Sequence, residues 1–156
     1  MKFDTTIRGK FKQLWKHYLL QSFLAAVVLL LLVLVLGRER MVVISAMGAT
    51  AFIVFATPKD YAAQTRNVVG GHLVGLIIGC IFCLTSLPPF IEYPLVVGIA
   101  VFVMVALDVE HPPAAGTALA VVINEVSPGV FVTIMISALV LSQCRYFLRN
   151  YLKDLL

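Results

Sequence analysis

The chain has 156 residues, of which 61% are hydrophobic and 13% are charged, and its formal net charge is +4. Soluble domains carry about half apolar and about a quarter charged residues, so this chain has too little polar surface to cover a globule in water. Its mean hydropathy is +1.00. We therefore expect one all-α membrane domain, with the lipid bilayer as its main partner and no nucleic acid.

Six apolar segments follow one another along the chain, separated by charged or Pro/Gly-rich stretches, and each is expected to be helical: 18–36, 41–57, 68–87, 94–107, 113–124 and 129–148. The first is expected to be a retained span, because about 19 residues of helix nearly match the ~30 Å hydrocarbon core and no small-residue cleavage site follows. The fifth is short, so we expect it to be partial or broken and to need irregular backbone before it.

Lysine and arginine placement predicts the orientation, because short cytoplasmic loops are enriched in both residues. Both tails are basic, so both termini are expected to be cytoplasmic and the number of crossings even. Six crossings place Lys59 and Arg66 inside and leave Arg38 and Arg40 outside. If the two short segments only dip into the bilayer, all four residues share the outer side, which fits the rule less well.

The two halves of the chain resemble each other, since each has a long segment, a short one rich in small residues, and another long one. The short ones contain 46–52 and 114–119, with Ala, Gly and Thr in similar order. Three crossings per half would make an inverted repeat, as in transporters whose sites lie where interrupted helices meet. The alternative is chance, because small residues are common in packed membrane helices. Gly71, Gly75 and Gly79, four apart, predict a close approach of another helix and favour a homo-oligomer.

The stretch 108–117 concentrates polar residues between two apolar segments. Proline keeps the preceding residue extended and suits the first turn of a helix, so His111 should lie at a break just before a helix that starts near Pro113. A helix amino-terminus favours an anion. Asp108 or Glu110 could instead cap the same helix.

A second polar stretch, 66–72, begins the third segment. The forked donors of Arg66 suit oxyanions, although Arg66 could simply mark the cytoplasmic end of the span, and Asn67 is a plausible helix cap. His72 lies deeper. Ionisable residues at such depth face a bundle interior or an aqueous path, and the alternative is a structural hydrogen bond to a backbone carbonyl.

The cysteines Cys80, Cys83 and Cys144 all lie in apolar segments. A Cys-x-x-Cys pair can indicate metal or redox chemistry, but here no second ligand pair accompanies it. We interpret them as small buried thiols and expect no metal site and no cofactor.

The stretches 66–72 and 111–119 resemble the signature motifs of the HPP family of membrane proteins, named for His-Pro-Pro, and 48–51 ahead of Pro58 resembles a third motif. The resemblance covers nearly the whole chain from residue 18. It implies four transmembrane helices, fewer than the charge pattern favours, and nitrite transport, as in plant chloroplast members. Some members have proline where this chain has Thr65. With no appended regulatory domain and no transit leader, we expect a stand-alone protein of the bacterial inner membrane.

We therefore hypothesise a transporter or channel for a small inorganic anion, nitrite by family resemblance, with no catalytic residues. The anion would lie at helix amino-termini near Gly48 and the turn Pro112–Pro113, and its donors would be Arg66, Asn67, Thr50 and Thr117. Protons could pass through His72 and His111, which titrate near neutrality, with Asp108 and Glu110 as further relay candidates. The alternatives are a redox or metal-binding protein that uses both histidines as ligands, and a non-transporting scaffold or sensor subunit.

Overall fold

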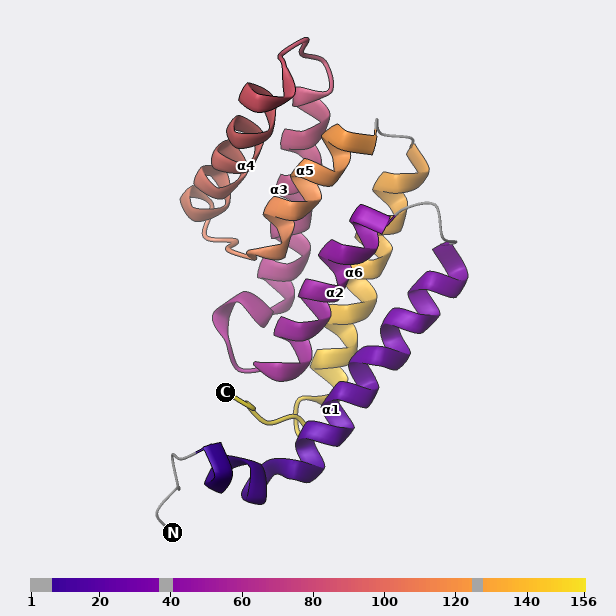
Figure 1. Cartoon of the computed structure of the whole chain (residues 1–156), viewed down its shortest axis with the longest axis vertical. Helices are drawn as coiled ribbons and strands as arrows, with labels where there is room; N and C mark the ends of the chain where they lie inside the picture. Colours follow the sequence, from indigo (N-terminus) through magenta and orange to yellow (C-terminus); the bar gives the residue numbers. More distant parts are fainter. Residues whose placement is uncertain (1–6, 37–40, 125–127) are drawn as a thin grey trace.

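A computed structural model describes residues 7–36, 41–124 and 128–156 of the chain. These residues form six α-helices and one short 3-10 helix without any strand, which confirms the all-α prediction. The elements are α1 (Ile7–Leu36), α2 (Met41–Ala56), η1 (Tyr61–Ala63), α3 (Thr65–Phe82), α4 (Pro89–Ala106), α5 (Pro113–Asn124) and α6 (Pro128–Leu148) (Figure 1). The expected separators at 37–40, with Arg38 and Arg40, and at 125–127 lie outside the described residues.

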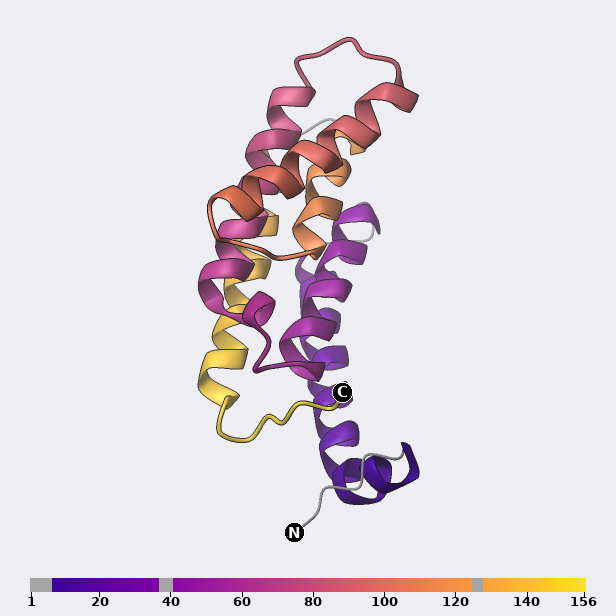
Figure 2. The same cartoon turned by 90° about the vertical axis from the view of Figure 1, so that its left-hand side faces the viewer.

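Successive helices run in opposite directions along the long axis of the molecule (Figures 1 and 2). The end of the chain lies near the same end of the bundle as the start of α1. The linker between α4 and α5 turns back part-way along the molecule, so that α5 begins there and does not extend along the whole bundle. This agrees with the expected partial fifth span preceded by irregular backbone, where Asp108 has a φ of 58°.

Four helices, α1, α3, α4 and α6, are long and apolar enough to cross a membrane, and α2 and α5 are shorter apolar helices. The outer faces of the long helices carry large apolar side chains: Phe102 on α4 is 72% exposed and Phe147 on α6 is 73% exposed. In water each of these side chains would leave ~1.5–3 kcal/mol of burial energy unrealised. Lipid supplies the missing apolar surroundings, and the chain is an integral membrane protein.

The predicted boundaries between the third and fourth segments were wrong. We expected helices over 68–87 and 94–107, whereas α3 ends at Phe82 and α4 begins at Pro89. Proline suits the first turn of a helix because it has no N–H to leave unpaired, so Pro89 starts a helix that the sequence pattern placed later. The first helix also begins before residue 18, since the lysines that ended the apolar run are good helix formers.

The helices of the two halves pack in the same pattern. Within each half the first helix packs against the second, α1 on α2 and α4 on α5. Between the halves, the second helix of each half packs against the third helix of the other half, α2 on α6 and α5 on α3. The two second helices, α2 and α5, also pack together, and so do the two third helices, α3 and α6. This equivalence of α1–α3 with α4–α6 is the pattern that an inverted repeat requires.

The glycines of α3 lie against α5 and allow the two helices to touch. A Cβ atom added at Gly71 would lie 2.7 Å from Cβ of His111, and one at Gly79 would lie 2.6 Å from Cβ of Val121. One added at Gly75 would overlap the carbonyl oxygen of Ala114. The predicted close approach is therefore real. It occurs within the chain, so these glycines do not supply the surface for a homo-oligomer that the sequence suggested.

The end of the chain is tied to α1 and α2. The backbone N–H of Leu155 donates to the carbonyl of Ala56 at 2.9 Å. The buried Gln21 side chain of α1 donates to the carbonyls of Phe55 and of Lys153, and accepts from the N–H of Lys153 at 3.1 Å. These bonds satisfy carbonyl groups at the end of α2, which the helix itself leaves without partners.

Candidate functional site

Four polar side chains meet in the interior of the bundle, where α2, α3 and α5 converge. They are Thr50 of α2, His72 of α3, Thr117 of α5, and His111 at the end of the linker before α5. All four are fully buried. Because buried polar groups need hydrogen-bond partners, the contacts among them define what this cluster can do. We call it the His–Thr cluster.

Every ring nitrogen in the cluster has a partner. The Thr50 hydroxyl oxygen lies 2.9 Å from Nε2 of His72 and 3.0 Å from Nε2 of His111. On the opposite edges of the rings, Nδ1 of His72 lies 2.8 Å from the Thr117 hydroxyl and Nδ1 of His111 lies 2.8 Å from the carbonyl oxygen of Ala62. The two rings meet edge-on with centroids 5.0 Å apart.

Local backbone features bring these residues together. Gly71 lets α3 approach the linker closely, so its neighbour His72 reaches the same space as His111. Pro112 and Pro113 turn the chain from the linker into α5, and the carbonyl of His111 accepts from the N–H of Ala114 at 2.9 Å. On the other side, the Asp60 carboxylate accepts from the N–H of Ala62 at 3.0 Å and fixes η1, which presents the Ala62 carbonyl to His111.

The two helix amino-termini expected to hold an anion differ from the expectation in different ways. At the start of α5, Pro112 and Pro113 have no N–H, and the N–H groups of Ala114 and Ala115 are bound to the carbonyls of His111 and Pro112. These two N–H groups are therefore engaged within the protein. Gly48 lies inside α2, which begins at Met41, so it is not at a helix amino-terminus either.

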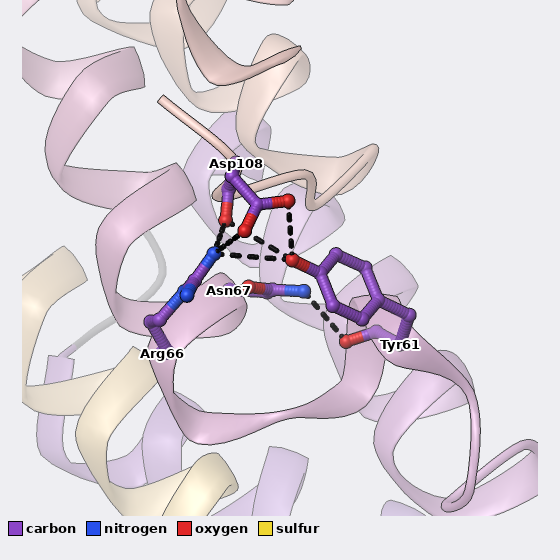
Figure 3. A network of polar contacts seen from close by, with 4 residues as sticks. All are labelled: Tyr61, Arg66, Asn67 and Asp108. Atoms are coloured by element: carbon purple, nitrogen blue, oxygen red, sulfur yellow. Dashed lines mark hydrogen bonds and ion pairs between the residues drawn. The ribbon is translucent and has the colours of Figure 1, made fainter. Parts of the chain in front are cut away.

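Arg66 belongs to a second cluster near the surface, together with Tyr61, Asn67 and Asp108 (Figure 3). Its guanidinium forms an ion pair with the Asp108 carboxylate and also donates to the Tyr61 hydroxyl at 3.1 Å. Tyr61 donates to the same carboxylate at 2.6 Å. Arg66 is thus already neutralised by Asp108, and this carboxylate does not cap α5, as one alternative had it.

The Asp108 carboxylate is held in its ionised form. Hydrogen bonds from Tyr61 and from Arg66 keep its pKa below the ordinary value of an aspartate. The same bond to Asp108 raises the pKa of Tyr61, because it favours the protonated phenol. The contact between the α4–α5 linker and the start of α3 therefore persists at neutral pH and weakens only as the pH falls through the lowered pKa of Asp108.

Asn67 does not cap α3, because Gln64 occupies the N-cap position. The Asn67 side chain is fully buried and its amide nitrogen donates to the carbonyl of Tyr61 at 2.7 Å. It thereby holds η1 against the first turn of α3. Its amide oxygen is buried and has no hydrogen-bond partner among the residues that the structure describes.

A groove of about 340 Å³ runs beside the His–Thr cluster, between α2 and α5. Small side chains and the two prolines of the turn line it: Ser45, Ala46, Ala49, Pro112, Pro113, Gly116 and Leu119. Ala46 also supplies a carbonyl that lies 3.0 Å from the Thr50 hydroxyl. Ala46 thus belongs both to the lining of the groove and to the surroundings of Thr50.

The cysteines are all free thiols, as expected. The expectation that they are buried was wrong: Cys80 and Cys144 are half-buried, and Cys83 is exposed because α3 ends before it and leaves it at the helix terminus. Within residues 7–36, 41–124 and 128–156, groups of three or more side chains able to hold a metal ion do not occur.

A model of the HPP transmembrane region matches residues 9–154, nearly the whole chain. The chain belongs to the HPP family. Two similar proteins of Dictyostelium discoideum are both named transmembrane proteins. The first is 32% identical over a match that covers 67% of this chain and 36% of the relative. The second is 30% identical over a match that covers 54% of this chain and 31% of the relative. The chain thus spans about a third of the length of the curated relatives it matches. No solved structure matches it.

The three stretches that resemble HPP motifs converge on the His–Thr cluster. The His-Pro-Pro stretch supplies His111 and Thr117, the stretch 66–72 supplies His72, and the stretch 48–51 supplies Thr50. Residues far apart in the sequence therefore share one buried hydrogen-bond network in this HPP protein.

Two groups that bond to the residues of these clusters, Tyr61 and the carbonyl of Ala62, were not anticipated from the sequence. Tyr61 lies in the polar stretch before Arg66, and a tyrosine hydroxyl beside an arginine near the end of a span is a signal that could have singled it out. The Ala62 carbonyl carries no signal at all, because a backbone group is invisible in the residue type. Its role is seen only in the structure, where η1 places this carbonyl 2.8 Å from Nδ1 of His111.

Proposed function

We propose that this HPP protein is not an enzyme but a transporter or channel for a small inorganic anion, and that nitrite is the first substrate to test. The observation that carries the proposal is the fully buried His–Thr cluster at the meeting point of the two short helices. Buried polar networks cost desolvation energy, and ionisable residues inside membrane helices usually belong to a substrate or ion path. An anion that reached the cluster would replace one of its internal hydrogen bonds and accept from the hydroxyl or imidazole donor so released.

The groove between α2 and α5 is the proposed place of entry. It reaches the Pro112–Pro113 turn and the Ala46 segment, which hold His111 and Thr50 from outside. Separation of α2 from α5 would open the groove onto the cluster. The contact of one short helix from each half suits a movement of the halves against each other, as in transporters built from inverted repeats.

The alternative of a metal or haem protein ligated by His72 and His111 is less well supported. Both Nε2 atoms are directed at the same hydroxyl oxygen at 2.9 and 3.0 Å, and both Nδ1 atoms also have partners. Ligation would require at least two of these bonds to be exchanged for bonds of ~2.0–2.1 Å to a metal. A scaffold role leaves the buried polar cluster without a purpose.

Nitrite uptake into liposomes tests the proposal. We expect purified protein to take up nitrite faster than empty liposomes do, and His111→Ala to slow uptake by roughly tenfold, equivalent to about 1.4 kcal/mol. Thr57→Val is the control, because the Thr57 hydroxyl donates to the carbonyl of Ile53 near the end of α2 and not to the cluster. Uptake no faster than in empty liposomes would refute nitrite transport.

We further propose six crossings with both termini in the cytoplasm of a bacterial inner membrane, supported by the basic tails and the alternating helix directions. Cys83 distinguishes six crossings from four, because α3 ends outside in the first case and inside in the second. A membrane-impermeant thiol reagent is expected to label Cys83 in intact cells, and Cys83→Ser should abolish that labelling. Labelling only after permeabilisation would support four crossings.

A homo-oligomer also remains a proposal, for which the α3 glycines no longer provide support, since α5 covers them. The molar mass of the purified protein in detergent, measured by light scattering, would decide it.

A further inference from the structure

The hydrogen bonds of the His–Thr cluster run in a single direction, which begins at His111. A carbonyl oxygen can only accept, so the bond of 2.8 Å between Nδ1 of His111 and Ala62 requires the proton on Nδ1. In a neutral imidazole the other nitrogen is then a bare acceptor. Nε2 of His111 must therefore receive a hydrogen from its neighbour, the Thr50 hydroxyl.

The direction continues through Thr50, because a hydroxyl has one hydrogen and two acceptor lone pairs. If that hydrogen goes to His111, the oxygen accepts from Nε2–H of His72, which lies 2.9 Å away. His72 then has a bare Nδ1, which accepts from the Thr117 hydroxyl at 2.8 Å. The two histidines are thus opposite tautomers, with His72 protonated at Nε2 and His111 at Nδ1.

The cluster also has a complete set of bonds with one extra proton. When a hydronium ion delivers a proton to Nε2 of His111, one of its O–H bonds breaks, a new N–H bond forms on the ring, and a neutral water molecule is left. The Thr50 hydrogen then turns to the carbonyl of Ala46, 3.0 Å away, and the Thr50 oxygen accepts N–H bonds from both rings. The Ala62 carbonyl continues to accept from His111 and stabilises the charged ring.

A second extra proton could not be accommodated in the same way. It would put cationic rings with centroids 5.0 Å apart in a buried site, and like charges at this distance disfavour each other strongly. The packed helices α2 and α5 carry no charged residue. Other charged groups nearby are engaged: Arg66 with Asp108, and Asp60 with the N–H of Ala62.

We propose that Thr50, His72, His111 and Thr117 form a binding site for a single proton, in which the Thr50 hydroxyl turns between Ala46 and His111 as the proton binds and leaves. Its use in transport, as the coupling ion for the anion, rests on the proposed function. Glu110 is half-buried and next to His111 in the chain, so the effect of its carboxylate on the charged state is tested below.

Nitrogen NMR of ring-labelled histidines in nanodiscs tests the site. At neutral pH we expect His72 protonated at Nε2 and His111 at Nδ1, with His17 assigned by His17→Gln. On acidification only His111 should gain a second proton, and Glu110→Gln should move the midpoint of that uptake to lower pH. Identical or mixed tautomers, or joint titration of both buried histidines, would overturn the proposal.

Substitutions at Thr50 separate the hydroxyl from mere packing. Thr50→Ser keeps the hydroxyl and should keep the tautomer pattern, whereas Thr50→Val should abolish it, and Thr57→Val should change nothing. If Thr50→Val keeps the tautomer pattern of the wild type, the proposed role of the turning Thr50 hydroxyl is contradicted. If wild-type protein shows the pattern but takes up no nitrite, nitrite transport fails and the proton site stands. If it takes up nitrite but its histidines are mixed tautomers, the proton site fails and nitrite transport stands.

Discussion

Gly75→Ala is expected to destabilise the protein by about 1–3 kcal/mol, the usual cost of overpacking a tight contact. The added Cβ would overlap the carbonyl oxygen of Ala114 and would lie 3.3 Å from the backbone nitrogen of Ala118. Backbone atoms cannot turn away as a side chain can, so α3 and α5 would have to separate. Thermal unfolding in detergent, followed by circular dichroism, measures the change.

Gly98→Ala is the matched control for this substitution. Gly98 also lies inside a helix, α4, but a Cβ there would meet nothing within 4 Å. Alanine is a better helix former than glycine by ~1 kcal/mol, so this variant should be as stable as the wild type or slightly more stable. Equal unfolding temperatures for Gly75→Ala and Gly98→Ala would show that α3 and α5 are not in contact as described.

Thr50→Val is expected to cost roughly 2–6 kcal/mol, although valine has nearly the volume of threonine. The change leaves two buried ring nitrogens, Nε2 of His72 and Nε2 of His111, without their shared partner. Each unsatisfied buried group costs ~1–3 kcal/mol. Anion uptake should be lost in the same variant, because the network that would hold the substrate or proton is cut at its centre.

Thr57→Val provides the comparison, since Thr57 has the same side chain and also bonds to the carbonyl four residues earlier, Ile53, at 3.1 Å. The Thr57 hydroxyl is not bonded to a histidine, so Thr57→Val should lower the stability of the protein by no more than about 1 kcal/mol. The two unfolding temperatures in the same detergent measure the difference. A Thr50→Val protein as stable and as active as Thr57→Val would mean that the hydroxyl is not the centre of the network.

The helix types and most helix positions were predictable because lipid demands long apolar segments. The boundary at Pro89 was not, since an apolar count cannot distinguish a proline that starts a helix from one that precedes it. Thr50, His72, His111 and Thr117 also stood out in the sequence, as polar residues in apolar surroundings, and the structure joins them in one network.

The partners of the polar groups were less predictable than the positions of the helices. Arg66 looked like an anion ligand, yet its partner Asp108 lies in a different linker, and only the packing of α3 on α5 brings the two together. Likewise the start of α5 resembled an anion site, but its first N–H groups are satisfied by the carbonyls of His111 and Pro112. Residue types indicate which groups need partners, and the tertiary fold decides which partners they find.

The position of His72 limits how the molecule can move. One edge of its ring is held by Thr50 of the first half of the chain and the other by Thr117 of the second half, so one rigid imidazole ring connects the two halves. Because Thr50 lies on α2 and Thr117 on α5, these two helices cannot separate at this point without breaking one of the two bonds. The opening of the groove proposed above would therefore have to release one edge of the His72 ring.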